Sequence, residues 1–249
     1  MAGPAPDPSR IAVLFHYFDR DESYQANLLC FLALAYRRDA DFFIVSCATR
    51  PPDLPDLPNL TLITVPNVNH DFGGHGIALR RLGLPDGYDR VVFINASVRG
   101  PFVPQGVDWL ARLTAPLGDP DTALAGCSIN ILNPASPIGA RVCAAFGHPG
   151  PFPHVQTTAY ALRAETLRGL IDDGFYASCD TPMNKAQVII RYEVGLSHRL
   201  LRQGRNIACL PDLYRGRDYR RVTQNFNWAA PDGDPAYPGR YFGRSLHPL

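Results

Sequence analysis

Residues 91–97 read VVFINAS and decide the fold class. The four apolar residues from Val91 to Ile94 are typical of a strand that is buried on both faces of a parallel sheet. The polar run Asn95-Ala96-Ser97 follows directly. Because ligands bind beyond the carboxyl ends of parallel strands, this run predicts a binding site where the strand ends.

The chain before this strand alternates strand-like and helix-like segments. Apolar runs predict strands at residues 10–18, 42–48 and 60–66. Helical periodicity predicts a helix capped by Asp19, and a glycine-rich turn at residues 71–76 opens a second helix. This order predicts an α/β fold with a mostly parallel sheet and helices on both faces, and the polar strand ends should meet at one edge.

The chain after residue 103 shows weaker patterns. Apolar runs and helical periodicity predict three strands and one long helix, at residues 123–129, 155–162, 207–210 and 184–203. The stretch after the first of these strands is rich in Pro and Gly and predicts a loop to about Pro153. No internal repeat or linker divides the chain, so residues 1–249 are predicted to form a single domain.

The composition restricts the classes of function. A net charge of +1 and a hydrophobic content of 46% fit a soluble globular protein without a nucleic-acid partner. No apolar run approaches the roughly 20 residues that a membrane span needs, and no signal peptide is visible. The six cysteines are scattered without a C-x-x-C pair, which favours free thiols in a reducing compartment. A cytoplasmic protein without a transmembrane segment is therefore predicted.

Several stretches of the chain resemble GT-A glycosyltransferases, and more closely their rhamnan-synthesis-type members. The similar segments follow one another in chain order, at residues 69–83, 88–102, 154–157, 192–211 and 241–249. In GT-A enzymes a glycine-containing turn and a helix lead into a strand that ends in an acidic DxD motif. The rhamnan-synthesis-type members have Asn-x-Ser at that place and continue into Gly-Pro-Phe, as residues 95–102 do here.

This resemblance implies a GT-A-like (Rossmann-like) fold in which residues 10–103 form the half that binds a nucleoside-diphosphate sugar. Residues 104–249 then form the acceptor and catalytic half, with an irregular C-terminal tail. The implied reaction transfers a hexose, or a deoxyhexose such as rhamnose, to a glycan or lipid-linked acceptor in surface polysaccharide synthesis. Peripheral attachment to the inner membrane face is a further expectation from the same resemblance.

The resemblance places Glu193 where inverting members carry the catalytic base, which takes the proton of the acceptor hydroxyl. The structural alternative is a solvated helix residue that pairs with Arg191. Asp71 lies between a strand and a glycine-rich turn, so its carboxylate could bind the base or ribose of the nucleotide. The alternative for Asp71 is a helix N-cap, a position that Asp fills readily.

Further contacts are predicted around these two carboxylates. Contacts to the donor are predicted for Asp71, Gly73, Gly74, Asn95, Ser97, Arg99 and His16. Contacts to the acceptor or the diphosphate are predicted for His154, Gln156 and His247. Asn95 and Ser97 occupy the DxD position without a charge, so Mg²⁺ or Mn²⁺ is an optional cofactor and metal independence is compatible with the residues. Arg99 could offset the diphosphate charge instead of a metal.

Two other readings compete with an inverting transferase. Retention of configuration would leave Glu193 without the role of a base. A non-catalytic module that binds nucleotide sugars or glycans would not need a carboxylate there. A hydrolase is disfavoured because no G-x-S-x-G motif occurs, and a nucleotidyltransferase because the chain has no basic glycine-rich loop near its start.

Overall fold

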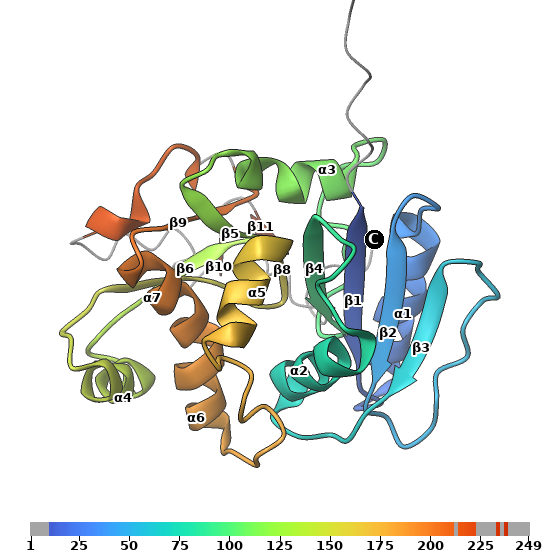
Figure 1. Cartoon of the computed structure of the whole chain (residues 1–249), viewed down its shortest axis with the longest axis horizontal. Helices are drawn as coiled ribbons and strands as arrows, with labels where there is room; N and C mark the ends of the chain where they lie inside the picture. Colours follow the sequence, from blue (N-terminus) through green and yellow to red (C-terminus); the bar gives the residue numbers. More distant parts are fainter. Residues whose placement is uncertain (1–9, 212–213, 223–232, 235–236, 239–249) are drawn as a thin grey trace, which may run out of the picture.

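The computed structural model describes residues 10–211, 214–222, 233–234 and 237–238 (Figure 1). Its centre is a seven-stranded sheet in the order β3-β2-β1-β4-β8-β5-β9. The strands are β1 (Ile11–Tyr17), β2 (Asp41–Ser46), β3 (Leu60–Thr64), β4 (Arg90–Asn95), β5 (Thr122–Gly126), β8 (Ala159–Arg163) and β9 (Asn206–Cys209). β8 runs antiparallel to β4 and β5, whereas the other pairs are parallel. The predicted mostly parallel sheet is confirmed.

Helices cover both faces of this sheet because successive strand residues point to opposite sides. On one face, α1 (Glu22–Ala35) and α3 (Trp109–Thr114) pack against strand residues such as Val13 and Phe15. On the other face, α2 (His70–Leu82), α5 (Ala164–Asp172) and α7 (Gly195–Arg202) pack against residues such as Leu14 and Phe93. The predicted α/β class with two covered faces is therefore confirmed.

The strand order reverses between β1 and β4. From β1 the chain passes through α1 to β2 and β3 on one side, and α2 then returns it to β4 on the other side of β1. His16 and Asn95 are neighbours in this pairing, at the carboxyl ends of the two strands. Such a switch point leaves a crevice beyond the strand ends, which is where open α/β sheets bind ligands.

Two local predictions in the first half are wrong. α1 is capped by Asp21 and not by Asp19, since the Ser23 amide donates to Asp21 Oδ1 at 3.0 Å. The glycines of residues 71–76 do not form a turn before a helix, because α2 already begins at His70 and contains them. Asp71 is accordingly a first-turn residue of α2, and the N-cap is Asn69.

The second half differs more from its prediction. The expected loop contains the short strand β6 (Ile129–Leu132) and the helix α4 (Pro137–Phe146). The strand expected at residues 155–162 is divided into β7 (Phe152–Val155), which pairs with β6, and β8. The long helix is confirmed as α6 (Lys185–Val188), a π-helical turn η2 (Ile189–Val194) and α7.

The remaining elements are short: η1 (Ala115–Gly118), η4 (Tyr219–Arg221), β10 (Gly233–Asp234) and β11 (Tyr237–Pro238). All six cysteines are free thiols. In the part of the chain that the structure describes, no helix has the length and apolar character required to cross a membrane.

Candidate active site

A pocket of about 560 Å³ opens at the carboxyl ends of β1 and β4. Its walls come from the β1–α1 connection, the segment leading into α2, the end of β4, the turn before β8 and the α6–η2 segment. Five of the predicted site residues line it: His16, Asp71, Asn95, Ser97 and Glu193. Residues that are far apart in the sequence thus meet at the switch point, and we call this space the switch-point pocket.

Asp71, Asn95 and Ser97 form one hydrogen-bonded group in this pocket. The Asn95 amide Nδ2 donates to Asp71 Oδ2 at 3.2 Å. Asn95 Oδ1 accepts from the Ser97 backbone amide at 3.1 Å and from the Ser97 hydroxyl. The two Ser97 donors fix the orientation of the Asn95 side chain, so its nitrogen faces Asp71.

The Asp71 carboxyl group is a weaker acid than an ordinary aspartate. Burial raises its pKa to about 6, the hydrogen bond from Asn95 opposes this, and repulsion from Glu193 adds to the rise. The charge of Glu193 is therefore felt by Asp71 across the pocket. Strong perturbation of this kind in a cleft is characteristic of functional sites.

Glu193 reaches the pocket from the π-helical turn η2. Its neighbours Tyr192 and Val194 are buried in the core, while Glu193 itself is half-buried. Burial raises the pKa of Glu193, and the nearby Lys185 opposes this rise. Single π-turns inside helices frequently occur at functional sites.

Gly195 makes this π-turn possible. A Cβ atom at this position would lie 2.8 Å from the carbonyl oxygen of Ile190. In an ordinary α-helix that carbonyl would lie farther from residue 195, so the close approach is a consequence of the wider turn. The glycine that follows Glu193 by two residues is thus the sequence feature that permits its placement.

His16 forms part of the inner wall of the pocket. Its ring is buried, and Nε2 lies 3.3 Å from Cys47 Sγ. Burial, with repulsion from His70, lowers the pKa of His16 to about 4, so the ring is neutral at pH 7. A Cβ on Gly74 would lie 2.5 Å from the His16 ring, so Gly74 lets α2 approach β1 closely.

Other predicted site residues lie outside this pocket. Gly73 and Gly74 are buried in α2, where Gly73 faces the carbonyl oxygen of Val68. Arg99 does not line the pocket, and its Nε donates to Asn27 Oδ1 at 3.1 Å. Their contacts to a donor remain predictions.

The two predicted acceptor contacts that the structure describes, His154 and Gln156, also lie outside this pocket. His154 is buried in β7, with Nδ1 at 3.1 Å from the carbonyl oxygen of Phe152, and burial lowers its pKa to about 4. Gln156 accepts a hydrogen bond from the Ser128 hydroxyl at 2.6 Å. His247 lies outside the described residues. Neither His154 nor Gln156 lines the switch-point pocket.

The side chains at the DxD position offer few free oxygen ligands to a metal ion. Mg²⁺ and Mn²⁺ prefer carboxylate oxygens, but Asn95 directs its nitrogen at Asp71 and its oxygen already accepts two hydrogen bonds from Ser97. Within the described ranges, no three His, Cys, Asp or Glu side chains gather into a group that could hold a metal ion. Asp71 alone supplies a charged oxygen to the Asn95–Ser97 group.

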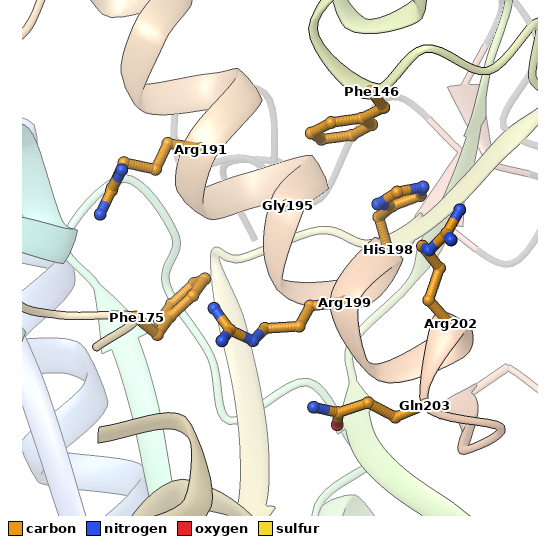
Figure 2. Close-up of a pocket in the computed structure, with 8 residues that line it drawn as sticks. All are labelled: Phe146, Phe175, Arg191, Gly195, His198, Arg199, Arg202 and Gln203. Atoms are coloured by element: carbon orange, nitrogen blue, oxygen red, sulfur yellow. The ribbon is translucent and has the colours of Figure 1, made fainter. Parts of the chain in front are cut away.

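A second pocket lies on the outer face of the helical segment that carries Glu193 (Figure 2). Figure 2 shows Arg191, His198, Arg199 and Arg202 projecting from this segment, which lies between the aromatic rings of Phe146 and Phe175. Arg199 pairs with Asp173 at 3.2 Å. None of the predicted site residues that the structure describes lines this pocket, and none of its lining residues belongs to a strand end.

Sequence reasoning missed several residues that line the switch-point pocket, among them Arg20, Asn69, Thr157, Thr158 and Lys185. Asn69 has a φ of 55°, in the left-handed region that costs energy for a residue with a side chain. The sequence offers one signal for Lys185, since it is the only lysine in the chain. No local pattern indicates that Thr157 and Thr158 separate two strands.

No family model and no curated protein matches the chain. Among solved structures it is similar to a putative nucleotide-diphospho-sugar transferase from Desulfovibrio desulfuricans G20, at 14% identity over 81% of this chain and 79% of that one, with a TM-score of 0.46. It is also similar to the galactosyltransferase LgtC bound to donor and acceptor sugar analogues, at 14% identity, 72% and 69% coverage and a TM-score of 0.40. A third similar structure is the bifunctional glycosyltransferase WbbM, at 14% identity, 84% and 40% coverage and a TM-score of 0.41.

Proposed function

We propose that this chain is a glycosyltransferase that moves a sugar from a nucleoside-diphosphate sugar to a hydroxyl group of a glycan or lipid-linked acceptor. One observation carries the proposal: two carboxylates with raised pKa values, Asp71 and Glu193, face the same pocket at the topological switch point. The order of the motifs along the chain, which resembles that of rhamnan-synthesis-type enzymes, supports it. A deoxyhexose donor, a role in surface polysaccharide synthesis and attachment to the inner membrane face are parts of the proposal that rest on this resemblance.

The proposed reaction inverts the configuration of the sugar. Glu193 takes the proton of the acceptor hydroxyl as the hydroxyl oxygen attacks the anomeric carbon. The bond from that carbon to the diphosphate oxygen breaks, and the nucleoside diphosphate leaves with the electron pair. A base is most effective when its pKa is near the working pH, so the raised pKa of Glu193 suits it to this role.

Asp71 and Asn95 are proposed to bind the hydroxyl groups of the donor. The Asn95 side chain is held in one orientation by Ser97, so it is preorganised for such contacts. The carboxylate of Asp71 accepts hydrogen bonds, and a sugar or ribose hydroxyl can replace water at that position. This arrangement selects for a polyhydroxylated ligand.

The test is the release of nucleoside diphosphate from a panel of UDP-, GDP- and dTDP-sugars, in Mn²⁺ and in EDTA, with oligosaccharide acceptors. Glu193→Gln keeps the shape of the side chain and removes the base, so turnover should fall by about 10²–10⁴-fold. The matched control is Glu22→Gln, since Glu22 is one of three glutamates in the chain and is exposed in the first turn of α1. The control should retain wild-type turnover.

The outcomes separate the competing functions. Release that is lost in Glu193→Gln and retained in Glu22→Gln supports the base-catalysed transferase. Turnover that survives in Glu193→Gln contradicts the role of the base and favours retention of configuration. Nucleotide-sugar binding without release, for every donor and acceptor, favours a binding module.

A further inference from the structure

Two cationic side chains line the described walls of the switch-point pocket, Arg20 and Lys185. Arg20 has two charged or aromatic neighbours of its own, since it pairs with Asp21 at 3.9 Å and lies 5.9 Å from the centre of the Tyr24 ring. The Lys185 side chain is exposed, and its ammonium group forms no hydrogen bond or ion pair with any residue that the structure describes. Its ammonium group is thus available to a ligand.

The backbone that carries Lys185 is held firmly. Asn184 caps α6 in a capping box with Gln187, with Gln187 N to Asn184 Oδ1 at 3.0 Å and Asn184 N to Gln187 Oε1 at 2.9 Å. A capping box satisfies amides that the first helical turn leaves free. Lys185 is the first residue of this helix, so the base of its side chain has a fixed position.

Asn69 ties the preceding segment to the start of α2. Its Nδ2 donates to the carbonyl oxygens of Cys179 at 2.9 Å and Thr181 at 2.7 Å, and its Oδ1 accepts from Met183 N at 2.8 Å. The buried side chain of Asn69 therefore joins two distant segments, one leading into Asp71 and the other into Lys185. These hydrogen bonds fix the position of the Lys185 backbone relative to Asp71.

The charge of Lys185 acts inside the pocket, because it lowers the pKa of Glu193 against the effect of burial. A diphosphate that enters this pocket meets the negative charges of Asp71 and Glu193. Asn95 and Ser97 are uncharged, so they do not compensate the charge of the diphosphate. Arg99, which was expected to offset the diphosphate, does not line the pocket. A cation on the pocket wall whose ammonium group makes no hydrogen bond or ion pair with the described residues is the group suited to a phosphate oxygen.

We infer that Lys185 binds the diphosphate of the nucleotide-sugar donor and stabilises the negative charge that grows on the leaving group. This inference rests on the proposed function. The sequence predicts that Arg99, in the donor-binding half, offsets the diphosphate charge. The inference gives this contact to Lys185, in the acceptor half. The ammonium group of a lysine donates up to three hydrogen bonds, so it can contact oxygens of both phosphates.

The chain itself offers a selective test, since Lys185 and the α-amino group are its only primary amines. Reductive methylation with formaldehyde and cyanoborohydride modifies both, and peptide mass spectrometry quantifies each. In EDTA, the nucleoside diphosphate that binds, and inorganic pyrophosphate, should slow methylation of Lys185 by about fivefold or more, as a charge-assisted hydrogen bond predicts. The corresponding nucleoside should not slow it, and the α-amine is the internal control.

Variants give an independent measurement. Lys185→Met should raise the Kd of the nucleoside diphosphate by about 10–100-fold in calorimetry and leave the Kd of the nucleoside unchanged. Lys185→Arg should restore most of the affinity. Arg202→Gln removes a cation from the opposite face of the same helical segment and should leave both values unchanged. Circular dichroism and Tm establish that each variant is folded.

Each outcome decides the inference. The inference is overturned, and the proposed function stands, if the nucleoside diphosphate binds without slowing the methylation of Lys185 and if it binds Lys185→Met as tightly as the wild-type protein. If the nucleoside protects Lys185 equally well, the contact is to the base or ribose and the diphosphate assignment is overturned. If the wild-type protein binds no nucleoside diphosphate with Mn²⁺ or with EDTA, the inference and the proposed function are both overturned.

Discussion

The side-chain amide of Asn95 donates a hydrogen bond to the carboxylate of Asp71, with 3.2 Å between Nδ2 and Oδ2. The hydrogen bond joins the end of β4 to the first turn of α2, two elements that meet at the switch point. It favours the ionised form of Asp71, but burial acts more strongly in the opposite direction. Asp71 is therefore a group that costs stability when it is ionised.

We predict that Asp71→Asn stabilises the protein at pH 7 and has little effect at pH 4. The folded-state pKa of Asp71 is about 6 against an ordinary 3.8, so the folded protein holds the proton more tightly. Stability is thus lost as the pH rises from about 4 to 6, by up to about 3 kcal/mol. Asparagine is neutral throughout, and its oxygen can still accept the hydrogen bond from Asn95.

The measurement is urea unfolding at pH 4 and pH 7. The matched control is Asp53→Asn, because Asp53 is exposed on a distant loop. This control should change the free energy of unfolding equally at both pH values. An equal increase in the free energy of unfolding of Asp71→Asn at pH 4 and pH 7 would contradict the raised pKa of Asp71.

The rate of sugar transfer should decrease when the pH falls, because Glu193 must be ionised to act as a base. Burial raises the pKa of Glu193 above that of an ordinary glutamate, so the decrease begins at a higher pH than usual. Lys185 lowers this pKa, so removal of its charge in Lys185→Met should move the acid limb of kcat/KM to still higher pH. Arg202→Gln should not shift the acid limb. If Lys185→Met does not shift it either, the charges of Lys185 and Glu193 do not interact.

Gly195→Ala should disrupt the π-turn that presents Glu193. The new methyl group would lie 2.8 Å from the Ile190 carbonyl oxygen, so the turn must open or shift. We expect kcat to fall by at least about tenfold, since a displacement of 1 Å can cost as much as 10²-fold. Nucleotide affinity should change much less than kcat, and wild-type kcat in a folded Gly195→Ala protein would contradict the importance of the turn.

Gly74→Ala and Gly169→Ala should change stability in opposite directions, although both replace a glycine inside a helix. A Cβ on Gly74 would lie 2.5 Å from the His16 ring and force it to move, at a cost of about 1–3 kcal/mol. A Cβ on Gly169 in α5 meets nothing within 4 Å, so alanine should stabilise by about 0.5–1 kcal/mol. Thermal unfolding measures both, and destabilisation by Gly169→Ala would contradict this view of α5.

The sequence predicted the centre of the molecule because its signals there are local. Four apolar residues before Asn95 indicate a buried strand wherever they occur, and polar strand ends gather at one edge by topology alone. Asp71 and Glu193 were predicted for the site, and the structure places both in one pocket. The ligands of Asp71 and Glu193 in this pocket remain predictions.

The second half could not be predicted as well, since its signals are ambiguous. The proline and glycine residues after β6 indicated a loop, but Pro137 is the first residue of α4 and Gly147 is its left-handed C-cap. Both residues favour helix ends as well as loops. The separation of β7 from β8 depends on pairing with different partners, which no local pattern records.

The position of β8 has a consequence for how the protein is made. β4 can pair on one side with β1 as soon as it is synthesised, but its other neighbour is β8, which ends at Arg163. At about 5–20 residues per second, the nascent chain exposes the free edge of β4 for roughly 3–14 s before β8 is complete. Val91 to Ile94 are fully apolar, so this edge is the segment where a chaperone would bind the growing chain or where two such chains would aggregate.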